Sequence, residues 1–376
     1  MKFLKGGSFG AIATLVGITV GAGVLGMPYV MAKAGFLTGV LVLILLTFIM
    51  IVSSLYIGEV IQRTRGKHQL LGLTEYYLGK KGKIIISIFI LAGLYGSLAA
   101  YTIASGSILN TLFSGGDQIL LSILFWILVS IIILSQLNFI NKLESIFSPA
   151  KVIILLVIAI ALITQIRPQN LLIFNPAQIH IPLGVILFSL LGLFGLVEMN
   201  EELKNKKLLK KSIIIGIILS AVCYLIFSTA LVGVMGISTP EIATTGLISL
   251  GGTALILINL FILLCLLTVA IALGFALKEA FILDYNLKNN KAWLLTILPP
   301  LIIAIFKPAS FINLLGLTAT FGGGLLIAVM LIVHSKAVKI GKVNPTYSMP
   351  NKWWIKLILI FLFVIATIYE IIIAFF

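Results

Sequence analysis

The chain has 376 residues, of which 61% are hydrophobic and 10% are charged, and its mean hydropathy is +1.23. This composition excludes a soluble globular protein and a disordered one, and it is typical of a protein that crosses the lipid bilayer many times. The net charge of +15 does not indicate a nucleic-acid partner, because the basic residues gather in alternate loops between apolar segments.

Apolar stretches of about 20 residues recur along the chain, and each is long enough to cross roughly 30 Å of hydrocarbon. We predict about eleven membrane spans in a single all-α transmembrane domain that covers residues 1–376. The predicted spans are 8–33, 36–61, 83–113, 118–137, 147–166, 181–200, 212–236, 251–282, 290–306, 309–334 and 354–376. With a cytoplasmic N-terminus, only Lys33, Arg167 and Lys307 among the 26 basic residues fall outside, as the positive-inside rule expects. An odd number of spans then puts the C-terminus outside.

The first span contains Gly21-Ala22-Gly23 followed by Pro28. Proline removes one backbone donor and blocks the carbonyl four residues earlier, while glycine permits non-helical dihedral angles, so we expect this helix to break. The freed amides suit a carboxylate and the freed carbonyls suit a cation, which together suit a zwitterionic solute. The alternative is that these small residues only allow close helix packing.

A second glycine-rich segment lies in the sixth span, at Gly192 and Gly195. Many transporters consist of two inverted copies of one helical unit, with the solute site between the interrupted helices of the two copies. Spans one and six would occupy corresponding places in such a protein. We therefore predict a five-plus-five inverted repeat, with repeat one at about 8–166, repeat two at about 181–334 and an extra helix at about 354–376.

Several of these residues resemble the motifs of a known family. The segment Gly21 to Tyr29, GAGVLGMPY, followed by Ala34-Gly35, resembles the GxGVLxLPYA…G signature of the amino acid/auxin permease family, within the amino acid-polyamine-organocation superfamily. In the sixth span, Phe188 to Gly192 resembles the unwound FxxxG segment of that superfamily, and Glu201 to Asn205 resembles its EE(V/L)KN ending. Beyond these motifs the resemblance rests on the number of spans.

The resemblance implies a LeuT-type fold with discontinuous helices one and six, and secondary active transport of an amino acid by alternating access. The substrate-binding residues that it implies are Gly21, Ala22, Gly23, Val24, Tyr101, Phe188, Ser189, Leu190, Leu191 and Gly192. Amides of the first break would meet the substrate carboxylate, carbonyls of both breaks would meet its ammonium group, and Tyr101 and Leu191 would line the side-chain pocket. The alternative for Tyr101 is a packed ring whose hydroxyl bonds a neighbouring helix.

Two residues are candidates for coupling transport to an ion. Some proton-coupled relatives place a lysine early in helix five, where its ammonium group occupies the position of a sodium ion, and Lys151 resembles that lysine. Sodium-coupled relatives use carbonyls of span one and hydroxyls of span eight, for which Thr268 is the candidate, but this chain has Gly17 where some of them have asparagine. The alternatives are that Lys151 extends to the lipid headgroups and that Thr268 bonds its own helix.

These observations predict a symporter rather than an enzyme, in a prokaryotic plasma membrane. The pocket candidates are small or apolar and include no charged residue to pair a charged substrate, which favours a neutral, hydrophobic or aromatic amino acid. The expected partners are this amino acid, a coupling cation and the lipid bilayer, without a cofactor, a metal or a nucleic acid. We expect the coupling ion to be H⁺, with Na⁺ as the alternative; a membrane sensor or channel that reuses the fold is an alternative from a different class.

Overall fold

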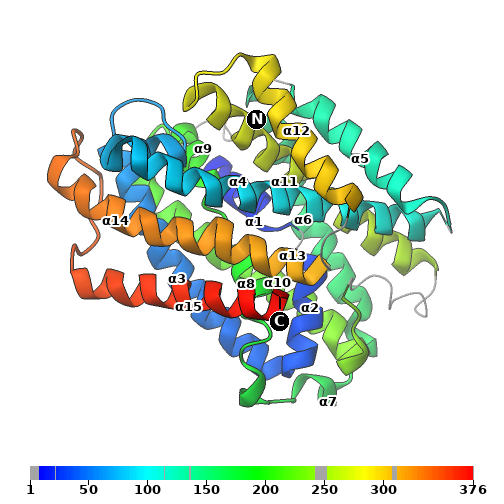
Figure 1. The fold of residues 1–376 in the computed structure, drawn as a ribbon. Coiled ribbons are helices and arrows are strands. Elements are labelled where there is room, and N and C mark those ends of the chain that lie inside the picture. Colours follow the sequence, from blue (N-terminus) through cyan, green and yellow to red (C-terminus); the bar gives the residue numbers. More distant parts are fainter. Residues whose placement is uncertain are drawn as a thin grey trace.

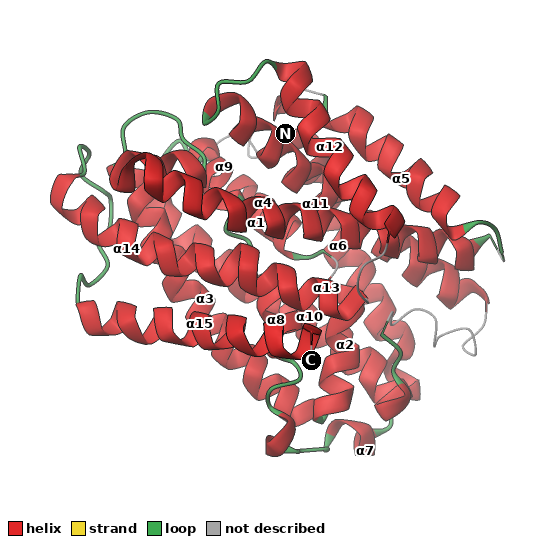
Figure 2. Cartoon of the chain, viewed as in Figure 1, coloured by secondary structure: helices red, strands yellow, loops and turns green. Residues whose placement is uncertain are grey.

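The structure is a computed structural model that describes residues 8–21, 23–113, 115–134, 137–241, 252–306 and 311–375. These residues form a bundle of helices, most of which run side by side (Figure 1). The described part of the chain contains helices and loops but no strand (Figure 2).

The described residues form fifteen α-helices, with short 3₁₀ and π segments between some of them. In chain order they are α1 (Ser8–Thr19), α2 (Gly23–Ala34), α3 (Phe36–Arg63), α4 (Leu70–Leu112), α5 (Gln118–Ile133), α6 (Leu137–Leu162), α7 (Pro168–Leu171), α8 (Leu183–Ser189), α9 (Gly195–Glu202), α10 (Leu209–Met235), α11 (Gly252–Leu283), α12 (Asn289–Phe306), α13 (Phe311–Thr318), α14 (Leu325–Ile340) and α15 (Trp353–Phe375).

The helices follow the predicted spans in order. Seven described helical segments are long and apolar enough to cross a membrane, and the bent pair α1 and α2 adds an eighth. The apolar helix α5, the apolar part of α6 (Pro149–Gln165) and the interrupted pair α8 and α9 occupy the other predicted spans. A π-helical segment, Ala319–Gly324, joins α13 to α14 within one span. The predicted all-α membrane fold with two discontinuous spans is therefore confirmed.

The outer surface of the bundle is apolar, as contact with lipid requires. On α3 the residues Leu37, Leu41, Ile44, Leu45 and Phe48 are all exposed, and their spacing places them on one face of the helix. Water would disfavour such a stripe, whereas hydrocarbon does not.

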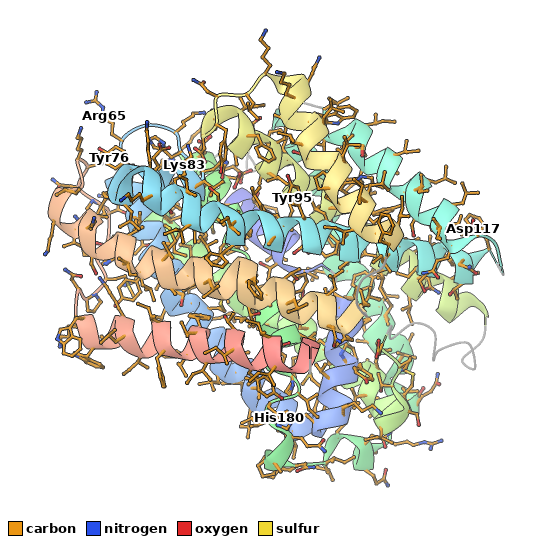
Figure 3. All side chains as sticks on the ribbon, viewed as in Figure 1. Arg65, Tyr76, Lys83, Tyr95, Asp117 and His180 are labelled. Atoms are coloured by element: carbon orange, nitrogen blue, oxygen red, sulfur yellow. The ribbon has the colours of Figure 1, made fainter. Side chains whose placement is uncertain are left out.

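Several charged residues lie toward the two ends of the bundle. Arg65 and Lys83 lie at one end and Asp117 at the opposite end (Figure 3). This separation agrees with the predicted inner and outer loops.

Glu59 connects three elements at the predicted cytoplasmic end. This residue of α3 is 0% exposed, and its carboxylate accepts hydrogen bonds from Arg63 Nε at 2.7 Å and from the Met349 amide at 2.5 Å. The Nε2 atom of His334, on α14, lies 2.9 Å from the same carboxylate. One buried charge thereby holds α14 and the loop before α15 against the end of α3.

We expect Glu59→Gln to destabilise the protein by about 3 kcal/mol, because it removes the negative charge from a buried network that includes Arg63. Thermal unfolding in detergent would measure the loss. The matched control is Glu75→Gln, whose carboxylate pairs with Lys83 at 2.6 Å but is 36% exposed; its cost should stay below about 1 kcal/mol. Equal melting temperatures for the two variants would contradict the structural role of Glu59.

Candidate functional site

The first predicted break is present between α1 and α2. The two helices are bent by 61° relative to each other, and they appear in Figure 1 as separate blue segments that point in different directions. At the break, the Val20 amide donates to Val16 O at 2.8 Å and the Val24 amide donates to Gly21 O at 3.1 Å. Ala22, which we predicted to bind substrate, lies outside the residues that the structure describes.

The second break separates α8 from α9. Residues 190–194 are not α-helical. The Leu191 amide donates to Phe188 O at 3.1 Å, and the Gly192 amide donates to Leu190 O at 2.9 Å. Each of these two carbonyl oxygens has a second lone pair for a further donor, so the break still offers acceptors to a ligand.

The two breaks touch each other through their glycines. A Cβ atom at Gly23 would overlap the Ser189 hydroxyl and would lie 2.9 Å from Ser189 Cα. A Cβ atom at Gly192 would lie 2.6 Å from both Thr19 Oγ1 and Leu15 Cδ1. The helix break and the alternative of close helix packing are therefore both correct, because the same glycines permit both.

A narrow cavity lies beside the contact between the breaks. It is lined by Ile18, Thr19, Gly93, Ser97, Tyr101, Phe188, Leu191, Phe194, Leu273, Thr318 and Gly322. Its volume is about 20 Å³, enough for about one water molecule. The structure thus shows a closed conformation of the cavity.

The cavity brings together three of the predicted site residues from two elements. Tyr101 of α4 meets Phe188 of α8 edge to face, with 6.2 Å between the ring centroids, and Leu191 contributes a further apolar wall. The hydroxyl groups of Ser97 and Thr318 donate to carbonyls of their own helices. The described lining contains no charged side chain, which agrees with a neutral guest.

Sequence reasoning missed Gly93 and Ser97 of α4, Leu273 of α11 and Gly322 of the π-helical segment. Gly93 of α4 crosses Gly322 so closely that a Cβ atom on either would overlap the other backbone. The run Gly322-Gly323-Gly324 was an available signal, since π-helical turns often mark functional sites. Its location beside Tyr101 depends on how the helices pack.

Lys151 of α6 points to the first break. It is 1% exposed, and its ammonium group donates to Gly17 O at 2.9 Å and to Val20 O at 3.3 Å. These carbonyls belong to the C-terminal end of α1, where the helix dipole favours a positive charge. The alternative in which Lys151 extends to the lipid headgroups is therefore wrong, because the side chain is directed into the protein.

Thr268 of α11 is buried, but its hydroxyl donates to Leu264 O and Cys265 O of its own helix, both at 3.0 Å. The alternative in which Thr268 bonds its own helix is thus what the structure shows. The adjacent Val269 packs against Gly21, where a Cβ atom would lie 2.8 Å from Val269 Cγ2. A hydroxyl in such a bond retains acceptor capacity.

Tyr224 of α10 is a site residue that the sequence analysis did not identify. Its hydroxyl donates to Thr19 O at 2.7 Å and accepts a hydrogen bond from the Gly21 amide at 3.3 Å. The Gly21 amide is consequently occupied by protein. A single tyrosine in an apolar span carries no motif, so only the packing of α10 against the break reveals it.

Two interrupted helices that meet beside a closed cavity, inside a bundle with an apolar exterior, define a membrane transporter. The chain matches the model of the tryptophan/tyrosine permease family over residues 5–370, and it belongs to that family. It is 27% identical over 333 residues to tyrosine-specific transport system 1 of Haemophilus influenzae, with 82% of each chain covered. It is 26% identical over 359 residues to the tryptophan-specific transport protein of Shigella flexneri, with 85% of each covered.

Among solved structures, the chain is similar to MhsT in complex with L-phenylalanine, with a TM-score of 0.70, 15% sequence identity and 98% of each chain covered. This similarity confirms the predicted LeuT-type fold. The relatives are transport proteins, so the protein is a multi-pass membrane transporter and not an enzyme, as predicted.

We expect Gly23→Ala to lower transport at least about tenfold, because the added methyl group overlaps Ser189 and separates the two breaks. Initial rates of amino acid uptake in proteoliposomes would measure the effect. Gly324→Ala is the matched control, because the nearest atom to its new Cβ would lie 3.5 Å away, an ordinary contact. If both variants transported equally well, the contact between the breaks would have no role in transport.

Proposed function

We propose that the protein is a proton-coupled transporter that takes up an aromatic amino acid, tyrosine or tryptophan, by alternating access. Two kinds of observation support the aromatic substrate. The relatives named above are tyrosine- and tryptophan-specific, and the cavity is lined by Tyr101, Phe188 and Phe194. Aromatic rings pack favourably edge to face or offset, so this lining suits an aromatic side chain.

The observation that carries the coupling proposal is the position of the Lys151 ammonium group. It lies on two carbonyls at the end of α1, where a sodium ion would otherwise find oxygen ligands. A protonated lysine supplies a positive charge and hydrogen bonds to these carbonyls without a metal ion. Loss of its proton would remove the positive charge and weaken the link between α6 and α1, which allows one protonation step to bias the position of α1.

The substrate backbone would bind where the two breaks face each other. The first amides of an α-helix such as α2 have no partner inside the helix. The Gly21 and Val24 amides are bonded within the protein. The Gly23 amide is therefore the first candidate to bind the substrate carboxylate. The carbonyls of Phe188, Ser189 and Leu190 would accept the ammonium group. Each of these roles rests on the geometry of the unwound segments.

Substrate entry requires the cavity to widen, because ligand pockets usually measure about 300–1,000 Å³. Leu191 is the side chain that fills the space: a Cβ atom at Gly323 would overlap its methyl groups. Displacement of Leu191 and of the adjacent unwound turn at Gly192 would open room beside Tyr101. The closed cavity would then be one state of an alternating-access cycle.

The proposed orientation places the N-terminus in the cytoplasm and the C-terminus outside, in a bacterial plasma membrane. The loop charges support this topology, and the bacterial relatives support a bacterial membrane. The motif around Gly21 also supports kinship with the amino acid/auxin permease family.

Purified protein in liposomes tests the proposal. We expect saturable uptake of labelled tyrosine or tryptophan that is driven by an inwardly directed proton gradient. Lys151→Met should abolish gradient-driven accumulation, because a thioether cannot carry the proton, whereas binding of the amino acid in a thermal-shift assay should persist. Gradient-driven uptake by Lys151→Met at the wild-type rate would refute the role of Lys151.

Sodium coupling is the second candidate, because Thr268 adjoins the residue that packs on Gly21. It requires uptake that follows a sodium gradient at constant pH and that is lost in Thr268→Ala. We expect neither, since the ammonium group of Lys151 already bonds the carbonyls of Gly17 and Val20.

A further inference from the structure

The break between α1 and α2 leaves four neighbouring backbone groups with side-chain partners. Lys151 accounts for Gly17 O and Val20 O, on the α6 side. The Thr19 carbonyl and the Gly21 amide are bonded from α10, by the hydroxyl of Tyr224. Side chains from two helices, α6 and α10, thus bond the backbone groups that one break frees. The proposed mechanism uses only Lys151 of α6.

Tyr224 reaches the break because α10 lies directly against α1. Gly216 precedes Tyr224 by eight residues, about two helical turns, so the two share a face of α10. A Cβ atom at Gly216 would lie 2.7 Å from a methyl group of Leu15 on α1, so glycine permits the close approach. Ser220, on the same face, donates to Gly216 O and adds no bulk at this contact.

The Tyr224 hydroxyl replaces the hydrogen bonds that a continuous helix would have made. Tyr224 is 1% exposed, so water is excluded around the ring. The hydroxyl donates on one side of the bend, to Thr19, and accepts on the other side, from Gly21. One oxygen atom therefore fixes the two sides relative to each other, and Gly21 leads directly into the first turn of α2, where the substrate carboxylate would bind.

We propose that Tyr224 is a positioning residue for the substrate: it holds the unwound segment between α1 and α2 in the conformation that receives the amino acid. This inference rests on the proposed function, because it assumes that the segment binds the solute. Without the hydroxyl, the Thr19 carbonyl and the Gly21 amide would have to find new partners, and binding would have to order the segment at a cost to affinity.

A second tyrosine in the same chain provides a matched control. The hydroxyl of Tyr95, on α4 (Figure 3), donates to Leu295 O at 2.8 Å. Leu295 lies four residues before Pro299, whose ring nitrogen cannot donate to that carbonyl. Both hydroxyls thus bond a backbone carbonyl of another helix, but the partner of Tyr95 is on α12 and not at the break between α1 and α2.

The experiment compares Tyr224→Phe with Tyr95→Phe in a counterflow exchange assay. The substrate is whichever of the twenty amino acids most raises the melting temperature of the wild-type protein. We expect Tyr224→Phe to raise KM about tenfold while the maximal rate per folded protein changes by less than about twofold, as the loss of one buried hydrogen-bonding group predicts. Tyr95→Phe should leave KM within about twofold of the wild-type value.

A purely structural role would give a different pattern. It would lower the melting temperature and the amount of active protein, but it would leave KM unchanged in Tyr224→Phe. Because KM does not depend on how much protein folds, uptake into whole cells yields it even if the purified variant is unstable. A KM as close to wild type as that of Tyr95→Phe, or no folded Tyr224→Phe protein in cells, would overturn the positioning role.

The assay separates this inference from the proposed function. If the amino acid that stabilises the wild type is not aromatic, the proposed substrate is wrong. If the exchange rate does not depend on pH, the proposed coupling is wrong. In both cases the KM of Tyr224→Phe still tests the role of Tyr224. A normal KM in Tyr224→Phe alongside proton-driven aromatic uptake by the wild type would refute the inference alone.

Discussion

Backbone amides and carbonyls in the middle of a bilayer have no water to bond, so each interruption of a membrane helix must be compensated by the surrounding protein or by a ligand. The break between α1 and α2 meets this demand with side chains from two other helices. Lys151 bonds the carbonyls of Gly17 and Val20, and Tyr224 bonds both Thr19 and Gly21. In the proposed function, the remaining amides at the start of α2 would receive the solute.

The second break depends on the first. Gly23 lies against Ser189, and Gly192 lies against Thr19, so each unwound segment forms part of the wall of the other. A solute that bridges them would contact elements from both halves of the chain. This arrangement explains why a small change in one segment would affect the other, and why a methyl group at Gly23 or Gly192 would separate the helices.

For the proposed proton coupling, the network also gives a physical account of how the charge of Lys151 and solute binding would be linked. The ammonium group of Lys151 and the hydroxyl of Tyr224 bond neighbouring residues at the same helix end. A change in the charge of Lys151 would alter the end of α1 a few residues from the segment that receives the solute. Coupling would then need no long pathway through the protein, because both sites share one short stretch of backbone.

The sequence by itself determined the membrane class, the order of the spans and the break beside Gly21 and Gly23, because long apolar segments, loop charges and helix-breaking residues are local properties. Pro28 lies inside α2 and not at the break. It also identified Lys151, Tyr101 and Phe188, through motifs that resemble a known family. The partner of each freed backbone group was decided only by the tertiary structure. Tyr224 carries no local signal, and the glycine run at Gly322 does not reveal its neighbours. Both residues reach the site because α10 and the π-helical segment pack against α1 and α4. Packing of this kind depends on the shapes of surfaces far apart in the chain, which no single segment of sequence encodes.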